Sequence, residues 1–181
     1  TRRTHSDVVK DALSQAMRRV AAIAVVHDTL SEGLSQSVDF DNVLERVLML
    51  VAEVASPGSS VVKLTTTGHV GILPSEYATP LALVLTELVT NAVEHGLKDK
   101  KDGQVNIESF RELDILRISV TDNGGGLADG KVGDGLGSQI VQTLVDGELG
   151  GSIDWHRQRS GGTEVRIRIP MRFLDSRDAA H

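Results

Sequence analysis

The sequence predicts an α+β fold, in which helices cover a mixed sheet and a long helix precedes it. Three observations lead to this prediction. Residues 1–36 carry an apolar heptad pattern, residues 80–98 form a mostly apolar helix with one polar stripe, and residues 105–121 and 152–169 contain alternating segments. A heptad pattern is typical of a helix that packs along another helix, whereas alternation is typical of half-buried strands.

The composition excludes several classes of protein. The 181 residues carry a formal charge of −6 and contain no cysteine. Such a chain lacks the clustered basic surface that binds nucleic acid, and it has neither disulfides nor thiolate ligands. No apolar run is long enough to span a membrane, and the N-terminus lacks a signal-peptide core. We therefore expect a cytoplasmic protein that contacts neither nucleic acid nor membrane.

Residues 1–36 are predicted to form one long helix. Its apolar seam follows spacings of four and three residues and consists of Val9, Leu13, Ala16, Val20, Ile23, His27, Leu30 and Leu34. The helix has no partner of its own in the sequence, so we expect it to dimerise or to pack against further chain. Because a seam position points inward, we favour a core-facing His27 at a dimer contact over a phosphoacceptor histidine.

Residues 37–79 are predicted to contain a second helix and two short strands. Residues 35–39 break the first helix, and the second spans residues 40–55, with Asp41 near its start and a Ser-Pro-Gly stop behind it. Residues 61–64 and 70–73 are of β type, and residues 65–68 are expected to connect them.

Residues 80–98 form the helix around which the chain is organised. Pro80 suits a first helical turn, and Gly96 suits a helix end. The helix is apolar on most sides and is therefore expected to be buried. Its polar residues share one face because they recur at spacings of three and four: Glu87, Asn91, Glu94, His95 and Lys98. Such a stripe indicates either a helix edge in water or a polar ligand.

A second polar signal lies at the end of a strand. Residues 105–110 and 115–121 are predicted to form an antiparallel pair, and their alternation places Asp122 on the inward face. An inward carboxylate is unfavourable unless it is paired or hydrogen-bonded. Asn123 and three glycines follow Asp122. A carboxylate beside glycines suits the amino group of a flat heterocycle, because the missing side chains let the ring approach.

A glycine-rich segment, residues 127–137, is predicted to be irregular and to precede a helix over residues 138–149. Free N–H groups and the helix dipole attract anions, so residues 133–137 suit a phosphate; a flexible surface loop is the equal alternative. An asparagine near a glutamate suits a Mg²⁺ ion bound mostly through nucleotide phosphates. Two further strands, residues 152–156 and 163–169, close the predicted sheet.

Four of these segments resemble the boxes of the Bergerat-fold ATP-binding superfamily, which includes histidine kinases, gyrase B, Hsp90 and MutL. Residues 87–96 resemble its N box, residues 122–126 its Asp-X-Gly-X-Gly box, residues 135–137 its second glycine box, and residues 162–163 its late Gly-Thr pair. The resemblance implies a Bergerat-type two-layer α/β sandwich as the catalytic ATP-binding domain, over residues 37–175, with a tail over residues 176–181.

Residues 18–30 resemble the second helix of the dimerisation and phosphotransfer hairpin in sensor kinases of the HisKA_2 type, which is close to the HWE kinases. The chain looks most like soluble actinobacterial sensor kinases of two-component systems. The resemblance implies that residues 1–36 belong to this hairpin and that the full-length protein is a homodimer through it. The family's acceptor segment has no match here, so we expect a fragment that does not autophosphorylate alone.

The resemblance implies a protein-histidine kinase that binds ATP or ADP and Mg²⁺ and passes the phosphate to a response regulator. Asn91 would coordinate Mg²⁺, and Glu87 would help with the metal or assist the transfer. Asp122 would bind the adenine amino group, with Gly124 and Gly126 giving the ring room. The remaining implied roles are phosphate binding by Gly135, Leu136 and Gly137, flanking of the phosphates by His95, support of Asp122 or the adenine by Thr163, and a nucleotide lid at residues 127–137.

Two alternatives stay open at this point. A serine kinase of the anti-sigma type shares the nucleotide fold but lacks the N-terminal hairpin, and a non-catalytic nucleotide-sensing dimerisation module would account for the missing acceptor. One residue also departs from the family pattern. Many histidine kinases carry a basic residue where this chain has Glu94, so Lys98 or Lys131 is expected to neutralise the phosphates.

Overall fold

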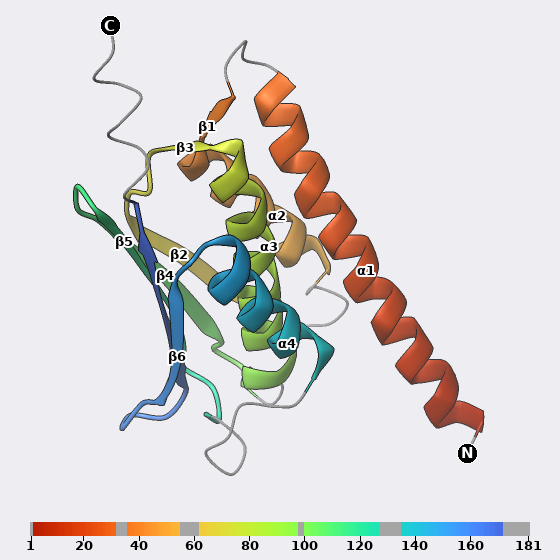
Figure 1. Cartoon of the computed structure of the whole chain (residues 1–181). Helices are drawn as coiled ribbons and strands as arrows, with labels where there is room; N and C mark the ends of the chain where they lie inside the picture. Colours follow the sequence, from red (N-terminus) through yellow and green to blue (C-terminus); the bar gives the residue numbers. More distant parts are fainter. Residues whose placement is uncertain (1, 32–35, 55–61, 98–99, 127–134, 172–181) are drawn as a thin grey trace, which may run out of the picture.

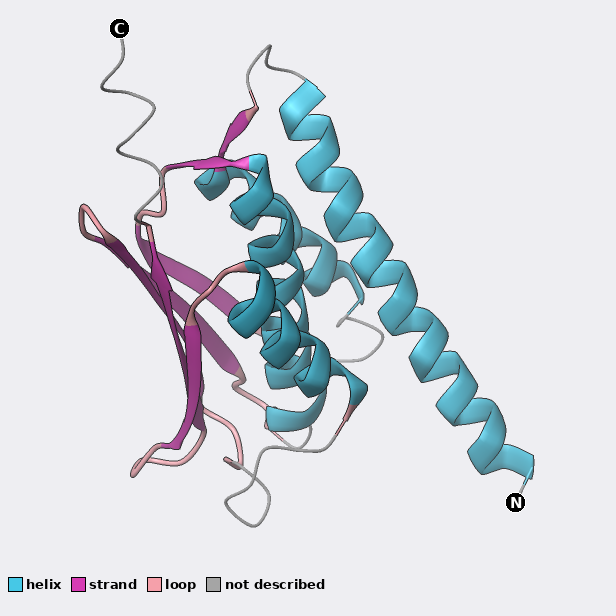
Figure 2. Ribbon diagram, in the orientation of Figure 1, coloured by secondary structure: helices cyan, strands magenta, loops and turns pink. Residues whose placement is uncertain are grey.

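Two layers, one of strands and one of helices, make up the computed structural model (Figure 1), which describes residues 2–31, 36–54, 62–97, 100–126 and 135–171. The strand layer is a five-stranded sheet in the order β2-β4-β5-β7-β6. Helices cover one face of this sheet, as Figure 2 shows. The predicted α+β fold with a mixed sheet is therefore confirmed.

The sheet is mixed because its first pair of strands is parallel and the other three pairs are antiparallel. Its strands are β2 (Lys63–Gly68), β4 (Gln104–Arg111), β5 (Ile115–Asp122), β7 (Thr163–Pro170) and β6 (Ser152–Arg157). Along β5 and β7 the inward apolar side chains alternate with polar ones, so each strand buries one face against the helices. The four strands predicted between residues 105 and 169 are all present.

The segment between β2 and the following strand differs from the prediction. Residues 65–68 were expected to form a connection, but they belong to β2 itself, because β-branched threonines favour an extended chain. The chain turns later, where the Asp41 carboxylate accepts hydrogen bonds from the backbone N–H groups of Val70 (2.9 Å) and Gly71 (3.1 Å). The next strand, β3 (Ile72–Pro74), pairs with β1 (Ser37–Asp39), which lies in the stretch predicted as a break.

The predicted helices after residue 39 are present, with one difference in extent. They are α2 (Phe40–Val54), α3 (Ser75–Asn91) with its π-helical continuation η1 (Ala92–Gly96), and α4 (Leu136–Thr143) with its continuation η3 (Leu144–Glu148). Helix α3 begins at Ser75, so Pro80 lies inside the helix and not in its first turn. A proline there removes one backbone hydrogen bond, and burial of its side chain offsets that loss.

The C-terminal end of α3 changes from α-helical to π-helical geometry directly after Asn91. The backbone N–H of Leu97 donates to the carbonyl oxygen of Ala92 at 2.9 Å, five residues earlier. Widened turns of this kind occur frequently at functional sites. The helix ends at Gly96, as predicted, and its preceding α-helical part is buried along most of its length.

Helix α1 (Arg2–Ser31) lies outside the other helices and packs against α2 and α3 (Figure 1). Its buried side chains are Arg18, Ala22, Val25 and Val26, all in its C-terminal half. The N-terminal half projects beyond the rest of the chain. Within the described ranges, no helix is long and apolar enough to cross a lipid bilayer.

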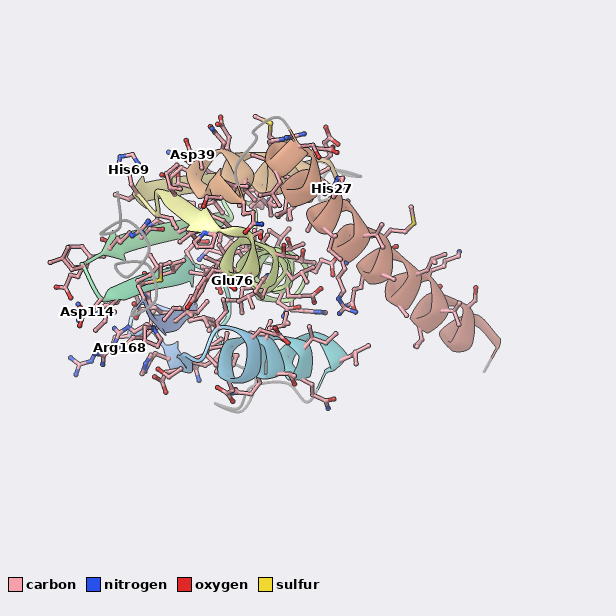
Figure 3. All side chains as sticks on the ribbon, turned by 45° about the horizontal axis from the view of Figure 1, so that its top comes forward. His27, Asp39, His69, Glu76, Asp114 and Arg168 are labelled. Atoms are coloured by element: carbon pink, nitrogen blue, oxygen red, sulfur yellow. The ribbon has the colours of Figure 1, made fainter. Side chains whose placement is uncertain are left out.

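The face of α1 that packs against the domain is not the predicted heptad seam. The seam residues Val9, Leu13 and Val20 are 54%, 61% and 67% exposed, and His27 is exposed as well (Figure 3). At about 100° per residue, these positions lie on the opposite side of the helix from Ala22. In the single chain His27 therefore faces away from the domain, and its place at a dimer contact, like that contact itself, stays a prediction.

This difference between the two faces of α1 can be tested with a matched pair of valine-to-alanine substitutions. Val26→Ala removes two methyl groups from a side chain that is 1% exposed, whereas Val20→Ala removes them from one that is 67% exposed. We expect Val26→Ala to lower the free energy of unfolding by about 1–3 kcal/mol and Val20→Ala to change it by less than about 0.5 kcal/mol. Urea denaturation at a concentration where the chain is monomeric measures both, and a larger loss at Val20 would contradict this packing.

Candidate functional site

The end of α3 and the beginning of α4 meet at one point, where polar side chains are held. Glu87 is buried, with 3% exposure, and Asn91 one turn later is half-buried. A Cβ atom on Gly137, in the first turn of α4, would lie 2.8 Å from Oε2 of Glu87 and 3.7 Å from Nδ2 of Asn91. The absence of a side chain at Gly137 therefore lets the α4 backbone approach both groups.

The first turn of α4 presents backbone N–H groups at this point. The helix begins after Gly135, whose extended backbone angles mark the N-cap and which supplies no side-chain cap. The predicted second glycine box, residues 135–137, therefore forms the start of the helix. Its middle residue, Leu136, is exposed. N–H groups in a first turn have no partner within the helix, and the helix dipole adds positive potential there. Residues 127–134, most of the predicted lid, lie outside the described residues.

Asp122 occupies the end of β5 and is buried, as the alternation predicts. Its Oδ1 accepts hydrogen bonds from the backbone N–H groups of Gly124 (2.8 Å) and Thr163 (3.3 Å). Within the described part of the chain, Oδ2 accepts no hydrogen bond, so one carboxylate oxygen is left for a donor from outside. Burial raises the pKa of Asp122 above its ordinary value, although the two backbone hydrogen bonds and the nearby Lys100 lower it.

The glycines after Asp122 join the end of β5 to the end of α3. A Cβ atom on Gly124 would lie 1.8 Å from the carbonyl oxygen of Gly96, so no other residue fits without a shift of the backbone. That same carbonyl accepts a hydrogen bond from the N–H of Gly125 at 3.1 Å. Gly126 has a φ of 79°, a conformation that favours glycine. This contact brings Asp122 to the same end of α3 as Asn91, one helical turn away.

The remaining predicted residues lie around these two clusters. His95 is on η1 and exposed, and Thr163 is buried but contacts Asp122 through its backbone N–H and not through its side chain. Glu94 forms an ion pair with Arg18 at 3.0 Å. Lys98 and Lys131, the two candidates for neutralising phosphates, lie outside the described residues.

Sequence analysis missed a cation at the centre of the site. Arg19 of α1 donates from Nε to Oε1 of Glu87 at 2.6 Å and from its second guanidinium nitrogen to Oε2 at 3.2 Å. A buried carboxylate needs such a partner, because an unpaired charge in the interior is unfavourable. The available signal is the Arg18-Arg19 pair beside Ala22 and Val25, since two arginines on a buried helix face imply acidic partners.

Two further polar residues stabilise the loop after β5. Asn123 accepts a hydrogen bond from the N–H of Gln104 at 2.8 Å and donates one to the carbonyl oxygen of Asp102 at 3.0 Å. Lys100 donates from Nζ to the carbonyl oxygen of Asn123. These bonds hold the loop next to Asp122 without occupying its free oxygen.

The donor set at Glu87 and Asn91 has consequences for metal binding. No group of three or more histidine, aspartate or glutamate side chains that could hold a metal ion occurs in the described part of the chain. One carboxylate and one amide oxygen do fit Mg²⁺, which usually keeps water and phosphate oxygens in its octahedral shell and takes one or two protein ligands.

Comparisons with known proteins agree with this geometry. The family model described as histidine kinase-, DNA gyrase B-, and HSP90-like ATPase matches residues 76–172, and the HisKA_2 histidine kinase model matches residues 1–55. The histidine kinase domain of the blue-light-activated kinase EL346 from Erythrobacter litoralis has a TM-score of 0.76 at 26% identity, covering 87% of this chain and 75% of that one.

Two curated relatives bear on the alternatives. The sensor histidine kinase PdtaS of Mycolicibacterium smegmatis is 41% identical over 174 residues, which are 94% of this chain but 35% of that protein. An anti-sigma F factor of Clostridium botulinum is 32% identical over 103 residues, which are 50% of this chain and 68% of that protein. The chain thus spans about a third of the length of PdtaS, and the histidine kinase similarity extends over far more of the chain than the anti-sigma similarity.

The ATPase-family model covers more than half of the chain, and the HisKA_2 match accounts for the helix that an anti-sigma kinase lacks. The chain therefore belongs to the family of histidine kinase-, DNA gyrase B- and HSP90-like ATPases, and it contains the ATPase domain of a histidine kinase.

Proposed function

We propose that this chain binds ATP together with Mg²⁺ between α3, β5 and α4, and that the protein transfers the γ-phosphate to a histidine side chain. One observation carries the proposal. The end of α3 brings together the buried Asp122 carboxylate and the Glu87–Asn91 pair, and the first turn of α4 lies against that pair. The Asp122 carboxylate suits a nucleobase, and the Glu87–Asn91 pair with the first turn of α4 suits phosphates. About one turn of helix separates the two.

The adenine end of the proposed site is Asp122. Its Oδ1 is held by the N–H groups of Gly124 and Thr163, so the carboxylate has a fixed orientation. Its Oδ2 then accepts a hydrogen bond from the exocyclic amino group of adenine. The backbone around Gly124 and Gly126 carries no side chains that would cover the ring.

The phosphate end of the proposed site lies between α3 and α4. The amide oxygen of Asn91 and the carboxylate of Glu87 face the metal, and the N–H groups of the first turn of α4, after Gly135, hold phosphate oxygens. His95 on η1 flanks this end, where an exposed imidazole can meet a phosphate. When bound, Mg²⁺ supplies positive charge that neutralises the β- and γ-phosphates.

The proposed reaction moves the γ-phosphoryl group from the bridging oxygen of ATP to an imidazole nitrogen. An imidazole nitrogen outside this chain forms a bond to the γ-phosphorus as the bond to the bridging oxygen breaks, which releases ADP and the imidazole proton. The chain contributes by holding ATP in line with the acceptor and by stabilising the charge of the transferred phosphate, which are the main sources of catalysis in phosphoryl transfer. The phosphate then passes to an aspartate of a response regulator in the cytoplasm.

A homodimer is part of the proposal because α1 has a second apolar face. Val9, Leu13 and Val20 are exposed and lie opposite the face that packs on α3, and the exposed Ile23 lies at the edge of that outer face. A seam with heptad spacing suits another helix, either from a second copy or from the rest of the hairpin.

Asp122→Asn should abolish nucleotide binding while the fold stays intact. An asparagine still accepts hydrogen bonds from the N–H groups of Gly124 and Thr163. In place of Oδ2, however, it presents an amide N–H₂ group, which cannot accept a hydrogen bond from the adenine amino group. In the parent chain, Mg-ATP at 100 times its dissociation constant should raise the unfolding free energy by about 2.7 kcal/mol. Thermal denaturation with and without Mg-ATP measures the difference. The matched control is Asp114→Asn on the exposed β4–β5 turn (Figure 3), and an Asp122→Asn chain that still responds would contradict the assignment.

The same substitution should change how the stability of the nucleotide-free chain depends on pH. Because burial raises the pKa of Asp122, its protonated form favours folding; this contribution is complete below the unfolded pKa and is lost as the pH rises through the folded pKa. Asparagine resembles the protonated form at every pH. We therefore expect Asp122→Asn to gain unfolding free energy relative to the parent as the pH rises from about 4 towards neutrality. Urea denaturation across this range, with Asp114→Asn running parallel to the parent, checks the sign.

Transfer itself can be tested with a separately supplied acceptor. A helical hairpin from a HisKA_2-type kinase, carrying the acceptor histidine, is incubated with this chain and γ-labelled ATP, and acid-labile label on the hairpin is measured. Asn91→Ala should lower the rate by about two orders of magnitude, because it removes a metal ligand, while Asn42→Ala on the exposed side of α2 should not. Tight ATP binding without any transfer would favour a nucleotide-sensing module.

A further inference from the structure

Two consecutive arginines of α1 contact the helix that carries the proposed metal ligands. Arg18 pairs with Glu94 at 3.0 Å, and Arg19 pairs with Glu87 at 2.6 Å. Glu87 on α3 and Glu94 on its continuation η1 are seven residues apart, about two turns, and both pair with the same part of α1. The two helices pack against each other in Figure 1, so these pairs cross the interface between α1 and the ATPase domain.

The two pairs are not equivalent. The Glu94 side chain is 37% exposed, so water screens its pairing with Arg18. The Glu87 side chain is 4% exposed, and both of its oxygens accept hydrogen bonds from the planar guanidinium of Arg19. A bidentate, charge-assisted pair of this kind is strong and directional. Arg19 therefore supplies the positive charge that the buried Glu87 needs.

The Glu87 carboxylate also lies against the first turn of α4, the phosphate end of the proposed site. Its Oε2 is the atom that a Cβ on Gly137 would approach to 2.8 Å, which places it at the first turn of α4 beside Asn91. One carboxylate thus lies between a guanidinium on α1 and the position where Asn91 would hold a metal ion. The Glu87 carboxylate cannot be fully paired with the guanidinium and fully coordinated to a metal ion at the same time.

Close to Glu87 in the sequence, helix α3 carries a buried polar group without a partner among the described residues. The hydroxyl oxygen of Thr90 is the one buried side-chain polar atom in the described residues without a hydrogen-bond partner. Thr90 on α3 is three residues after Glu87 and four before Glu94 on η1, so it is near both along the helix.

We propose that Arg19 is an internal counter-cation that competes with Mg²⁺ for Glu87, so that binding of the metal–nucleotide complex weakens the docking of α1 on α3. This inference rests on the proposed function, since it assigns Glu87 to the metal side of the ATP site. Thermodynamic linkage makes the effect reciprocal: docking of α1 lowers the affinity for Mg-nucleotide by the same factor. Arg19 is in this sense a positioning residue, which acts on the reaction through Glu87.

The test measures the affinity for a non-hydrolysable ATP analogue by calorimetry, once with Mg²⁺ and once with EDTA. Arg19→Gln should tighten binding in Mg²⁺ by about tenfold, the magnitude expected for a charge-assisted hydrogen bond, and should leave binding in EDTA unchanged. Arg18→Gln is the matched control, because it breaks the neighbouring pair without touching Glu87, and it should change neither affinity. In the Glu87→Gln background, Arg19→Gln should have no further effect on binding in Mg²⁺.

Three outcomes would overturn the inference while leaving the proposed function intact. Arg19→Gln could bind no more tightly in Mg²⁺, it could change only the affinity in EDTA, as a residue that attracts phosphates would, or Arg18→Gln could have the same effect, as simple loosening of α1 would. Failure of the proposed function has a different signature, namely no binding of the analogue by the parent chain in either buffer.

A second measurement keeps the Arg19–Glu87 pair intact, because its two substitutions are at exposed positions. The chain has no cysteine, so Ala24→Cys on the exposed side of α1 and Glu148→Cys on η3 give a unique pair of spin-label sites. We expect the distance distribution to shift to longer distances with the Mg²⁺ analogue complex and to stay unchanged with the analogue in EDTA. An unchanged distribution with the Mg²⁺ complex bound would overturn the inference.

Discussion

Helix α3 is buried along most of its length, yet its C-terminal end carries polar side chains that must find partners, and this constraint organises the molecule. A buried carboxylate at Glu87 is tolerable only beside a cation, which α1 supplies as Arg19. The backbone of α4 approaches the same carboxylate at Gly137, and the end of β5 is joined to α3 at Gly96. Three elements that are distant in the sequence thus converge on the C-terminal end of this helix.

The sequence predicted the parts of this arrangement that depend on periodicity. The alternation along β5 correctly placed Asp122 inside, and the apolar surround of α3 correctly indicated burial with one polar face. Both inferences work because side-chain direction follows directly from helical and extended geometry. The order of the polar segments then matched a family pattern, which no single glycine box would have specified.

Periodicity was insufficient where a segment had more than one apolar pattern or an exposed edge. Helix α1 has apolar residues on two opposite faces, and the heptad rule identified the outer one, although Ala22, Val25 and Val26 form the face that packs. The threonines of β2 resembled a polar connection, because an edge strand with one solvated face needs few apolar residues. Pro80 suggested a helix start, but tertiary packing of the earlier turns outweighed the loss of one hydrogen bond.

Contacts between distant segments lie beyond any local pattern, and the Arg19–Glu87 pair is the clearest case. Its partners are 68 residues apart in the sequence, and only the packing of α1 on α3 brings them together. The two faces of α1 then have a joint consequence. A helix behaves as a rigid body, so a partner bound at the outer seam near Val20 would fix the rotation of the inner face that carries Arg19. A turn of α1 by one residue's angle, about 100°, would swing the guanidinium away from α3. Events at the outer seam can therefore reach the Glu87 carboxylate without any change inside the ATPase domain.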